Sequence, residues 1–211
     1  MDIYLYGCGG HAKVVLDTLY EQGKKVKALI DDNPPLEVKE IYGIPIRKSS
    51  LELFHEIDCE CSQWIVAIGN NAIRKKITQK LEYQGYFFTT AIHPSARVSR
   101  NVEIGAGTVI MPNAVINTDS NIGQHVIINT CATIEHDCQI NDYCHVAPRG
   151  CICGNVKLGE SVFLGAGTQV IPGICIGDNT TCGAGSVVVK SLPSSCLAYG
   201  CPATVKQTDY S

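Results

Sequence analysis

Hydrophobic residues recur at every sixth position through the second half of the chain, from Ile92 to Val188. Sixteen of the seventeen positions in this series are Val, Ile or Leu, with Cys182 as the exception, and no insertion interrupts it. An α-helix repeats about every 3.6 residues and a β-strand every two, so neither explains a period of six. Hexapeptide repeats are typical of a parallel β-helix, in which each coil buries its apolar stripe against the next. The period therefore predicts a β-helix.

The first 90 residues follow a different pattern, in which short apolar runs alternate with amphipathic segments. The pattern predicts strands at IYLYG (3–7), VKALIDD (26–32) and QWIVAIGN (63–70), and helices at HAKVVLDTLYEQG (11–23), SSLELFHEI (49–57) and AIRKKITQKLEYQG (72–85). In the first helix, Val14, Val15 and Leu19 are expected to form the buried face. Such alternation is typical of a small parallel α/β sheet. We therefore predict an α/β domain over 1–90 and a β-helix domain over 91–211.

A glycine-rich turn follows the first predicted strand. Gly7, Gly9 and Ala12 fit the pattern G-x-G-x-x-A, and Asp31 follows about twenty residues later, as in dinucleotide-binding folds. The region is too short for two mononucleotide-binding halves, so a single nucleotide is a better candidate ligand than NAD. The ligand should lie at the carboxyl ends of the parallel strands. A tight turn that binds nothing is the alternative interpretation.

The composition argues against several classes of partner. Seventeen basic and 20 acidic residues give a formal net charge of −3, and no block of Lys or Arg could neutralise a row of phosphates, so nucleic acid is not expected. The sequence has no apolar run of about 18 residues and no export signal, which predicts a cytoplasmic protein without membrane contact. The twelve cysteines are then expected to be reduced thiols. Their C-x-C spacings do not match a zinc site, so no metal is expected.

A histidine flanked by two acids lies within the repeat. His136 stands between Glu135 and Asp137 and is third in its hexad, neither the aliphatic nor the small interior position, so its side chain should point outward. Attack by an amine on a carbonyl carbon requires removal of a proton as the tetrahedral intermediate forms. Imidazole is suited to this task, and an adjacent carboxylate can orient it and stabilise its protonated form. Either acid could assist, and position alone favours Asp137.

Four stretches, in the order YGCGGHAKVV, LIDDN, IEHDC and YGCPATVKQ, resemble the nucleotide-aminosugar N-acetyltransferases, relatives of the bacillosamine- and perosamine-pathway acetyltransferases and of sialic acid O-acetyltransferases. The resemblance covers essentially the whole chain. It implies a Rossmann-like α/β domain followed by a left-handed parallel β-helix with three hexads per coil. It also implies a homotrimer with acetyl-CoA in clefts between neighbouring subunits.

The resemblance also assigns roles to individual residues. The catalytic histidine of the family corresponds to His136. Positions of the family that hold the sugar nucleotide match Gly9, Gly10, His11, Asp31, Asp32, Gly69, Asn70 and Arg74. Positions that line the acetyl-CoA site match His145, Gly154, Gly183, Ala184 and Pro202.

The spacing of two histidines adds a geometric condition. His145 follows His136 by nine residues, which is half of an 18-residue coil, so the two side chains should lie on different sides of the β-helix. They could then serve one site only if neighbouring subunits supply them. The alternative for His145 is a solvated surface histidine.

The sequence as a whole predicts an acetyl-CoA-dependent N-acetyltransferase that acts on the amino group of a nucleotide-linked 4-amino-4,6-dideoxy sugar. Its nucleobase, for example in a UDP, dTDP or GDP sugar, stays open. One alternative is O-acetylation of sialic acid or of another sugar hydroxyl. A second is a trimeric scaffold that binds a sugar nucleotide without catalysis, and a third is a γ-carbonic-anhydrase-like enzyme. The third needs three histidine ligands per zinc, and the histidines of the repeat do not have the required spacing.

Overall fold

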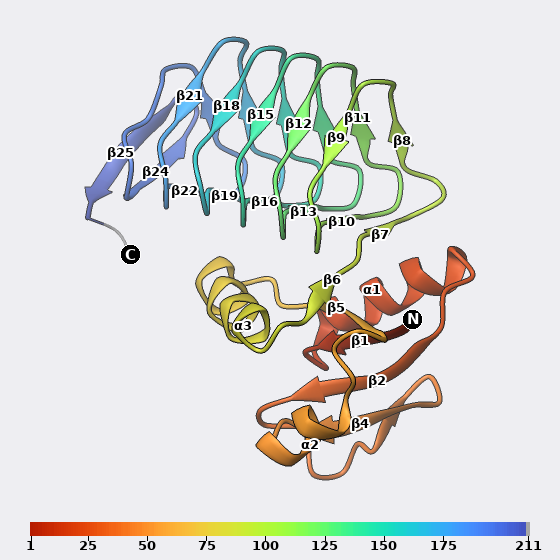
Figure 1. Cartoon of the computed structure of the whole chain (residues 1–211). Coiled ribbons are helices and arrows are strands. Elements are labelled where there is room, and N and C mark those ends of the chain that lie inside the picture. The colour runs from red at the N-terminus through yellow and green to blue at the C-terminus, as the bar shows by residue number, and fades with distance from the viewer. Residues whose placement is uncertain (210–211) are drawn as a thin grey trace.

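The computed structural model describes residues 1–209 and consists of an α/β region and a long β-helix (Figure 1). The α/β region contains β1 to β6 and α1 to α3, and the β-helix begins at β7. The final two residues of the predicted 91–211 domain, 210 and 211, lie outside the described residues.

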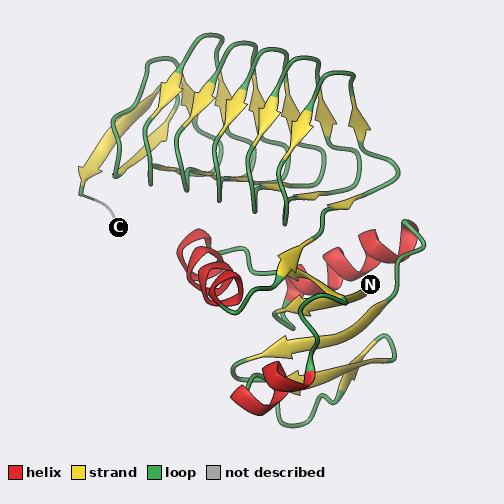
Figure 2. Cartoon of the chain, in the orientation of Figure 1, coloured by secondary structure: helices red, strands yellow, loops and turns green. Residues whose placement is uncertain are grey.

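The α/β region is built on a six-stranded sheet with the order β3-β4-β2-β1-β5-β6. All neighbouring strands are parallel except the β3–β4 hairpin. The strands are β1 (Asp2–Tyr6), β2 (Val26–Asp31), β3 (Glu40–Ile41), β4 (Ile44–Lys48), β5 (Ser62–Val66) and β6 (Phe87–Phe88). The helices, red in Figure 2, are α1 (Gly10–Glu21), α2 (Leu51–Glu56) and α3 (Asn71–Tyr83). The predicted parallel α/β sheet is thus confirmed.

Alternate residues of the central strands enter two separate cores. Ile3 and Leu5 of β1 pack with α1, whereas Tyr4 and Tyr6 pack on the opposite face of the sheet with buried residues of α2 and α3. Helices therefore cover both faces, which is why β1, β2 and β5 each contain at least three consecutive buried apolar residues rather than alternating ones.

Two parts of the sequence prediction for this region need correction. The strands β3, β4 and β6 were not predicted, because two of them have two residues each and β4 is only partly buried. The predicted core residue Val14 is 39% exposed, and Leu16 is buried instead. The buried positions of α1 include Ala12, Val15, Leu16 and Leu19, which follow the three- and four-residue steps of one helix face.

The β-helix consists of seventeen two-residue strands from β7 to β23, one for each hexad, so the predicted repeat is confirmed. Strands three apart in the chain pair in parallel with an offset of 18 residues, as Ile110 pairs with Ile128. The strands therefore form three sheets, whose members are β7 (Ala91–Ile92), β10 (Val109–Ile110), β13 (Ile127–Ile128), β16 (His145–Val146), β19 (Phe163–Leu164) and β22 (Thr181–Cys182) in the first; β8 (Arg97–Val98), β11 (Val115–Ile116), β14 (Thr133–Ile134), β17 (Cys151–Ile152), β20 (Gln169–Val170) and β23 (Val187–Val188) in the second; and β9 (Glu103–Ile104), β12 (Asn121–Ile122), β15 (Gln139–Ile140), β18 (Lys157–Leu158) and β21 (Cys175–Ile176) in the third.

The aliphatic series fills the interior of the β-helix, where Ile116, Ile134 and Ile152 are fully buried. From Asn101 to Gly185, every sixth residue adopts a positive φ at the turn between strands, and in many turns this residue is not glycine; examples are Asn113 (φ 57°), Asp119 (φ 59°) and Asp137 (φ 58°). Asn and Asp tolerate this left-handed conformation better than most residues. The turn chemistry therefore supports the six-residue period independently of the core.

The outer face of the first sheet packs against the α/β region. Val109, Met111 and Ile127 of the β-helix belong to the same buried cluster as α1. At the other end, β24 (Cys196–Gly200) and β25 (Ala203–Thr208) form an antiparallel hairpin that extends the first sheet. The shared core therefore fixes the α/β region on one side of the β-helix (Figure 1).

Candidate active site

His136 lies in the turn between β14 and β15, where the chain passes from the second sheet to the third. Its side chain is 59% exposed, and its flanking interior residues Ile134 and Cys138 are buried. The outward orientation predicted from the hexad register is therefore found in the structure.

The two flanking acids have different partners. Asp137 Oδ2 lies 2.7 Å from His136 Nδ1, whereas Glu135 accepts a hydrogen bond of 2.8 Å from Asn117 Nδ2. The left-handed turn at Asp137 brings its carboxylate back toward the preceding ring. His136 Nε2 has no hydrogen-bond partner among residues 1–209, so this nitrogen is available to a ligand.

Gly154 lies beneath the ring of His136, one coil further along the β-helix. A Cβ atom at residue 154 would be 2.7 Å from both Cε1 and Nε2 of His136, closer than side chains tolerate. The absence of a side chain at 154 therefore allows the imidazole to lie across the backbone.

The other predicted acetyl-CoA residues lie elsewhere in the chain. Gly183 and Ala184 follow β22, at the corner between the first and second sheets, and the Gly183 backbone faces Tyr199. Pro202 lies in the turn of the β24–β25 hairpin. Within one protomer, the structure therefore brings Gly154 to His136 but does not bring these three residues there.

His145 occupies β16, on the sheet that faces the α/β region, and is 9% exposed. Its Nδ1 lies 3.1 Å from Gly69 O, and its Nε2 lies 3.1 Å from Asn129 Nδ2. Because a carbonyl only accepts hydrogen bonds, Nδ1 donates and Nε2 accepts from the amide. Burial lowers the pKa of His145 to about 4. The alternative of a solvated surface histidine is therefore wrong, whereas the placement of His136 and His145 on different sides of the β-helix is correct.

The glycine turn connects β1 to α1 as predicted. Gly7 has φ +110°, and a Cβ there would lie 3.0 Å from Ala67 O, so the residue must be glycine. Gly9 and Gly10 are exposed at the start of α1, where no side chain caps the helix N–H groups. His11 follows in the first turn, and its ring centroid lies 6.4 Å from that of His145. Burial and the charge field of His145 and Arg74 lower the pKa of His11 to about 4.

Asp31 and Asp32 lie at the end of β2, beside the glycine turn. Asp31 accepts hydrogen bonds from Cys8 N at 3.1 Å and from Asn33 N at 2.9 Å. Asp32 accepts from the hydroxyls of Ser49 and Tyr6, and these two bonds lower the pKa of its carboxyl group. Both carboxylates are thus held at the carboxyl edge of the sheet.

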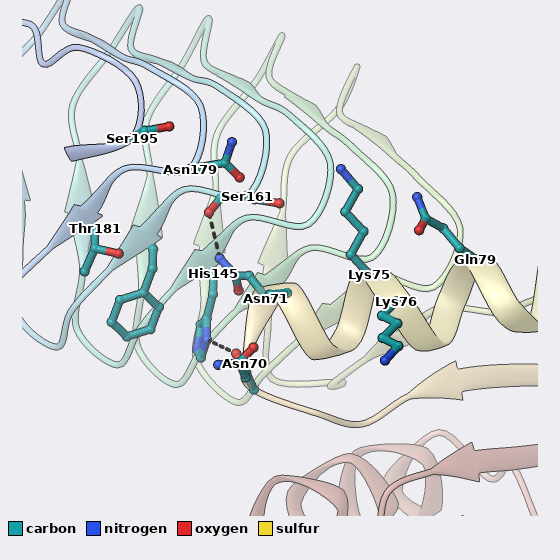
Figure 3. Close-up of a pocket in the computed structure, with 13 residues that line it drawn as sticks. Asn70, Asn71, Lys75, Lys76, Gln79, His145, Ser161, Asn179, Thr181 and Ser195 are labelled. Carbon is teal, nitrogen blue, oxygen red and sulfur yellow. Dashed lines mark hydrogen bonds between the residues drawn. The ribbon is translucent and has the colours of Figure 1, made fainter. Parts of the chain in front are cut away.

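A cleft of about 1000 Å³ separates the first turns of α3 from the outer face of the first sheet (Figure 3). Of the predicted residues, Gly69, Asn70 and His145 line it. Sequence reasoning missed the remaining lining residues, which are Asn71, Ala72, Lys75, Lys76, Gln79, Ser161, Phe163, Asn179, Thr181 and Ser195. Phe163 and Thr181 follow His145 by 18 and 36 residues, so the repeat itself carried the signal that they share its face.

Arg74 does not lie on the surface of this cleft, contrary to the prediction that it binds substrate. Its side chain is 1% exposed, and all three guanidinium nitrogens donate hydrogen bonds to protein oxygen atoms, among them His125 O and Tyr143 O. Its place is behind the cleft wall, between α3 and the β-helix.

Among residues 1–209, no group of three or more His, Cys, Asp or Glu side chains is arranged to hold a metal ion. No helix in that part of the chain is long and apolar enough to span a membrane.

Comparison with known proteins extends over both regions. The sequence model of the PglD N-terminal domain family matches residues 2–81. A crystal structure of a histidine-to-asparagine variant of perosamine N-acetyltransferase from Caulobacter crescentus, in complex with CoA and GDP-perosamine, is 42% identical, with a TM-score of 0.93 over 98% of this chain and 97% of that chain. The acetyltransferase domain of PglB from Neisseria gonorrhoeae, in complex with acetyl coenzyme A, is 32% identical, with a TM-score of 0.89 over 97% of this chain and 98% of that chain.

Curated relatives match over shorter stretches. The UDP-N-acetylbacillosamine N-acetyltransferase of Bacillus subtilis is 41% identical over 112 residues, which are 52% of this chain and 50% of that protein. The galactoside O-acetyltransferase of Lactococcus lactis is 47% identical over 53 residues, so the chain spans about a quarter of its length. The match to perosamine N-acetyltransferase, in contrast, includes the α/β region, the left-handed β-helix and their arrangement. The chain therefore belongs to the hexapeptide-repeat sugar N-acetyltransferases, a family of acyltransferases.

Proposed function

We propose that the protein transfers the acetyl group of acetyl-CoA to the amino group of a nucleotide-linked 4-amino-4,6-dideoxy sugar. The observation that carries the proposal is the similarity to perosamine N-acetyltransferase, 42% identical over nearly the whole length of both chains, whose structure contains CoA and GDP-perosamine. The acetyl-CoA complex of the PglB domain supports the same donor.

His136 is the proposed general base. In the reaction the sugar nitrogen forms an amide bond to the acetyl carbon, and the carbon–sulfur bond of the thioester breaks. The proton leaves the nitrogen and ends on the sulfur of CoA, so one group that accepts and then donates a proton serves both steps. The exposed Nε2 of His136 is suited to this, with Asp137 at Nδ1 to fix the tautomer and stabilise the imidazolium. Glu135, bonded to Asn117, is the second candidate for this assistance.

The proposed site lies between subunits of a homotrimer. His136 projects from the corner between the second and third sheets, whereas the cleft beside His145 opens on the first sheet. In one protomer these features lie on different sides of the β-helix, so a complete site needs His136 from one subunit and the cleft from its neighbour. Acetyl-CoA is proposed to lie along that boundary, contacted by His145, Gly154, Gly183, Ala184 and Pro202.

The α/β domain over 1–90 is proposed to bind the sugar nucleotide, and the domain over 91–211 to carry the acetyl transfer. Free amides at Gly9 and Gly10 suit a diphosphate at the start of α1. His11, Asp31 and Asp32 adjoin that position, and Gly69 and Asn70 connect it to the cleft.

Cytoplasmic location is part of the proposal. All twelve cysteines are free thiols in the structure, which is consistent with a reducing compartment.

A thiol-release assay with acetyl-CoA against a panel of UDP-, dTDP- and GDP-linked 4-amino sugars tests this function. We expect turnover with at least one amino sugar and a product with a new amide. Release with sialic acid or a galactoside, without release with any amino sugar, would support O-acetylation instead. Binding of a sugar nucleotide without release of thiol from acetyl-CoA would support the scaffold reading. Sedimentation analysis checks the trimer, which a monomer in solution would contradict.

A further inference from the structure

Arg74 joins the two regions of the molecule by binding main-chain carbonyls of both. Nη1 donates to Ile68 O at 3.0 Å and to Gly69 O at 3.2 Å, within the loop that leads from β5 into α3. Nε donates to His125 O at 2.8 Å, and Nη2 donates to Tyr143 O at 2.7 Å, both in turns of the β-helix. One side chain therefore holds the rim of the cleft against the coils that face it.

The contacts extend to three successive coils. Asn71, three residues before Arg74 on the same helix face, accepts from Arg74 Nη2 at 2.9 Å and donates to Ser161 O at 3.0 Å. The three carbonyls, at 125, 143 and 161, are spaced by 18 residues and belong to turn residues with φ between 54° and 59°. The left-handed turns thus present a regular row of carbonyls, and α3 docks on that row.

This arrangement is unusual for a buried cation. Arg74 is 1% exposed, yet it takes part in none of the ion pairs found among residues 1–209. Desolvation of an unpaired charge is unfavourable and has to be offset by hydrogen bonds to the surrounding dipoles. An arginine used for general stability would be placed more favourably at the surface, so its position points to a need for fixed geometry at this junction.

The part of the molecule fixed by Arg74 is the wall of the cleft. Gly69 O accepts from Arg74 and also faces Nδ1 of His145, while Asn70 caps α3 by accepting from Ile73 N at 2.9 Å. Figure 3 shows Asn70 and Asn71 at the start of α3, directly opposite His145 and Ser161. Movement of this loop would change the cleft and the angle of the α/β region on the β-helix together.

We propose that Arg74 is a positioning residue, which with Asn71 forms a latch between α3 and three coils of the β-helix and so fixes how the α/β region presents its bound ligand. The inference rests on the proposed function: the presented ligand is the sugar nucleotide, and the point it must reach is the acetyl group at the subunit boundary. A displacement of about 1 Å there lowers the rate on the order of 10²-fold.

The first test compares steady-state kinetics of Arg74→Met and Arg74→Lys with those of the wild-type trimer. For Arg74→Met we expect kcat/KM for the amino-sugar nucleotide to fall on the order of 10²-fold, with KM for acetyl-CoA unchanged. Arg74→Lys keeps the charge but not the planar fork of donors, so its loss should be intermediate. Wild-type kcat and kcat/KM in folded Arg74→Met, or a rise in KM for acetyl-CoA as large as any rise in KM for the amino-sugar nucleotide, would overturn the proposal.

The second test does not depend on activity. Amide hydrogen exchange in residues 68–74 should become faster in Arg74→Met and, to a smaller extent, in Asn71→Ala. Asn71→Ala keeps the buried arginine and so tests the latch independently of whether Arg74→Met folds. Lys80→Gln is the matched control, because it removes one positive charge from the same helix. The Lys80 side chain contacts the ring of Phe54 rather than the β-helix. Unchanged exchange in both Arg74→Met and Asn71→Ala would contradict the proposed latch. Faster exchange in an enzyme that acetylates no amino sugar would retain the latch and reject the proposed function.

Discussion

His136 and His145 are nine residues apart in one regular repeat, yet they occupy opposite environments. His136 is 59% exposed at a corner of the β-helix, with one ring nitrogen beside Asp137 and the other free. His145 is 9% exposed on a sheet face, and both of its ring nitrogens have protein partners. Both side chains point away from the interior of the β-helix. Their difference therefore depends on what packs outside: the α/β region covers the first sheet and leaves the corner at His136 open.

The two environments suit different chemical tasks. A histidine that exchanges protons with a substrate needs an accessible nitrogen and a partner for the protonated ring, and His136 has both. His145 is kept neutral by burial, and its hydrogen bonds fix one tautomer. It can therefore orient neighbouring groups, but as placed here it has no free nitrogen with which to take up a proton.

The largest expected effect is the loss of activity in His136→Ala. General-base catalysis contributes on the order of 10² to 10⁴ in rate, so kcat should fall within that range while thermal stability stays close to wild type. The thiol-release assay with the preferred amino sugar measures it. His93→Ala is the control, because His93 is a half-buried histidine of the β-helix whose ring bonds Ser95 instead of an acid. Activity retained in His136→Ala would reject the base assignment.

A smaller effect distinguishes the two acids beside His136. Asp137→Asn removes the carboxylate at Nδ1 and should lower kcat by roughly tenfold, less than in a buried triad because water screens the exposed pair. Glu135→Gln keeps an acceptor for Asn117 and should leave kcat near wild type. The two substitutions remove one negative charge each, on either side of His136, so each controls for the other. A larger loss in Glu135→Gln would reverse the assignment.

Much of the β-helix follows from local rules and was predictable. The six-residue period indicates a coil built of hexads, so the strands, the interior positions and the outward direction of His136 could be read from the register, whereas the three hexads per coil came from the family resemblance. The same rule could have identified Phe163, which shares the face of His145 one coil further on.

The site could be predicted less completely, because it depends on long-range packing. Whether an outward residue is exposed is decided by the α/β region, whose orientation no repeat encodes. Arg74 illustrates this. Its sequence context suggested a ligand contact, but it donates hydrogen bonds to His125 O and Tyr143 O, which lie 51 and 69 positions further along the chain. Val14 shows the same limit at smaller scale: of the three residues predicted for the buried face of α1, Val15 and Leu19 are buried but Val14 is exposed.

The smallest expected effect is on the pH dependence of stability, and it sharpens the contrast between buried and exposed histidines. Burial lowers the pKa of His11, His125 and His145 from 6.5 to about 4. Between these values the unfolded chain binds protons that the folded protein does not, so the free energy of unfolding falls as pH decreases from about 6.5 to 4, with an upper limit of about 1.4 kcal/mol per pH unit for each histidine. Urea unfolding of His125→Asn should therefore give a shallower slope over this range, and asparagine suits the φ of 54° at this turn. The control is His55→Asn, at an exposed site of α2, which should keep the wild-type slope. Equal slopes in His125→Asn and wild type would show that burial of His125 does not destabilise its protonated form.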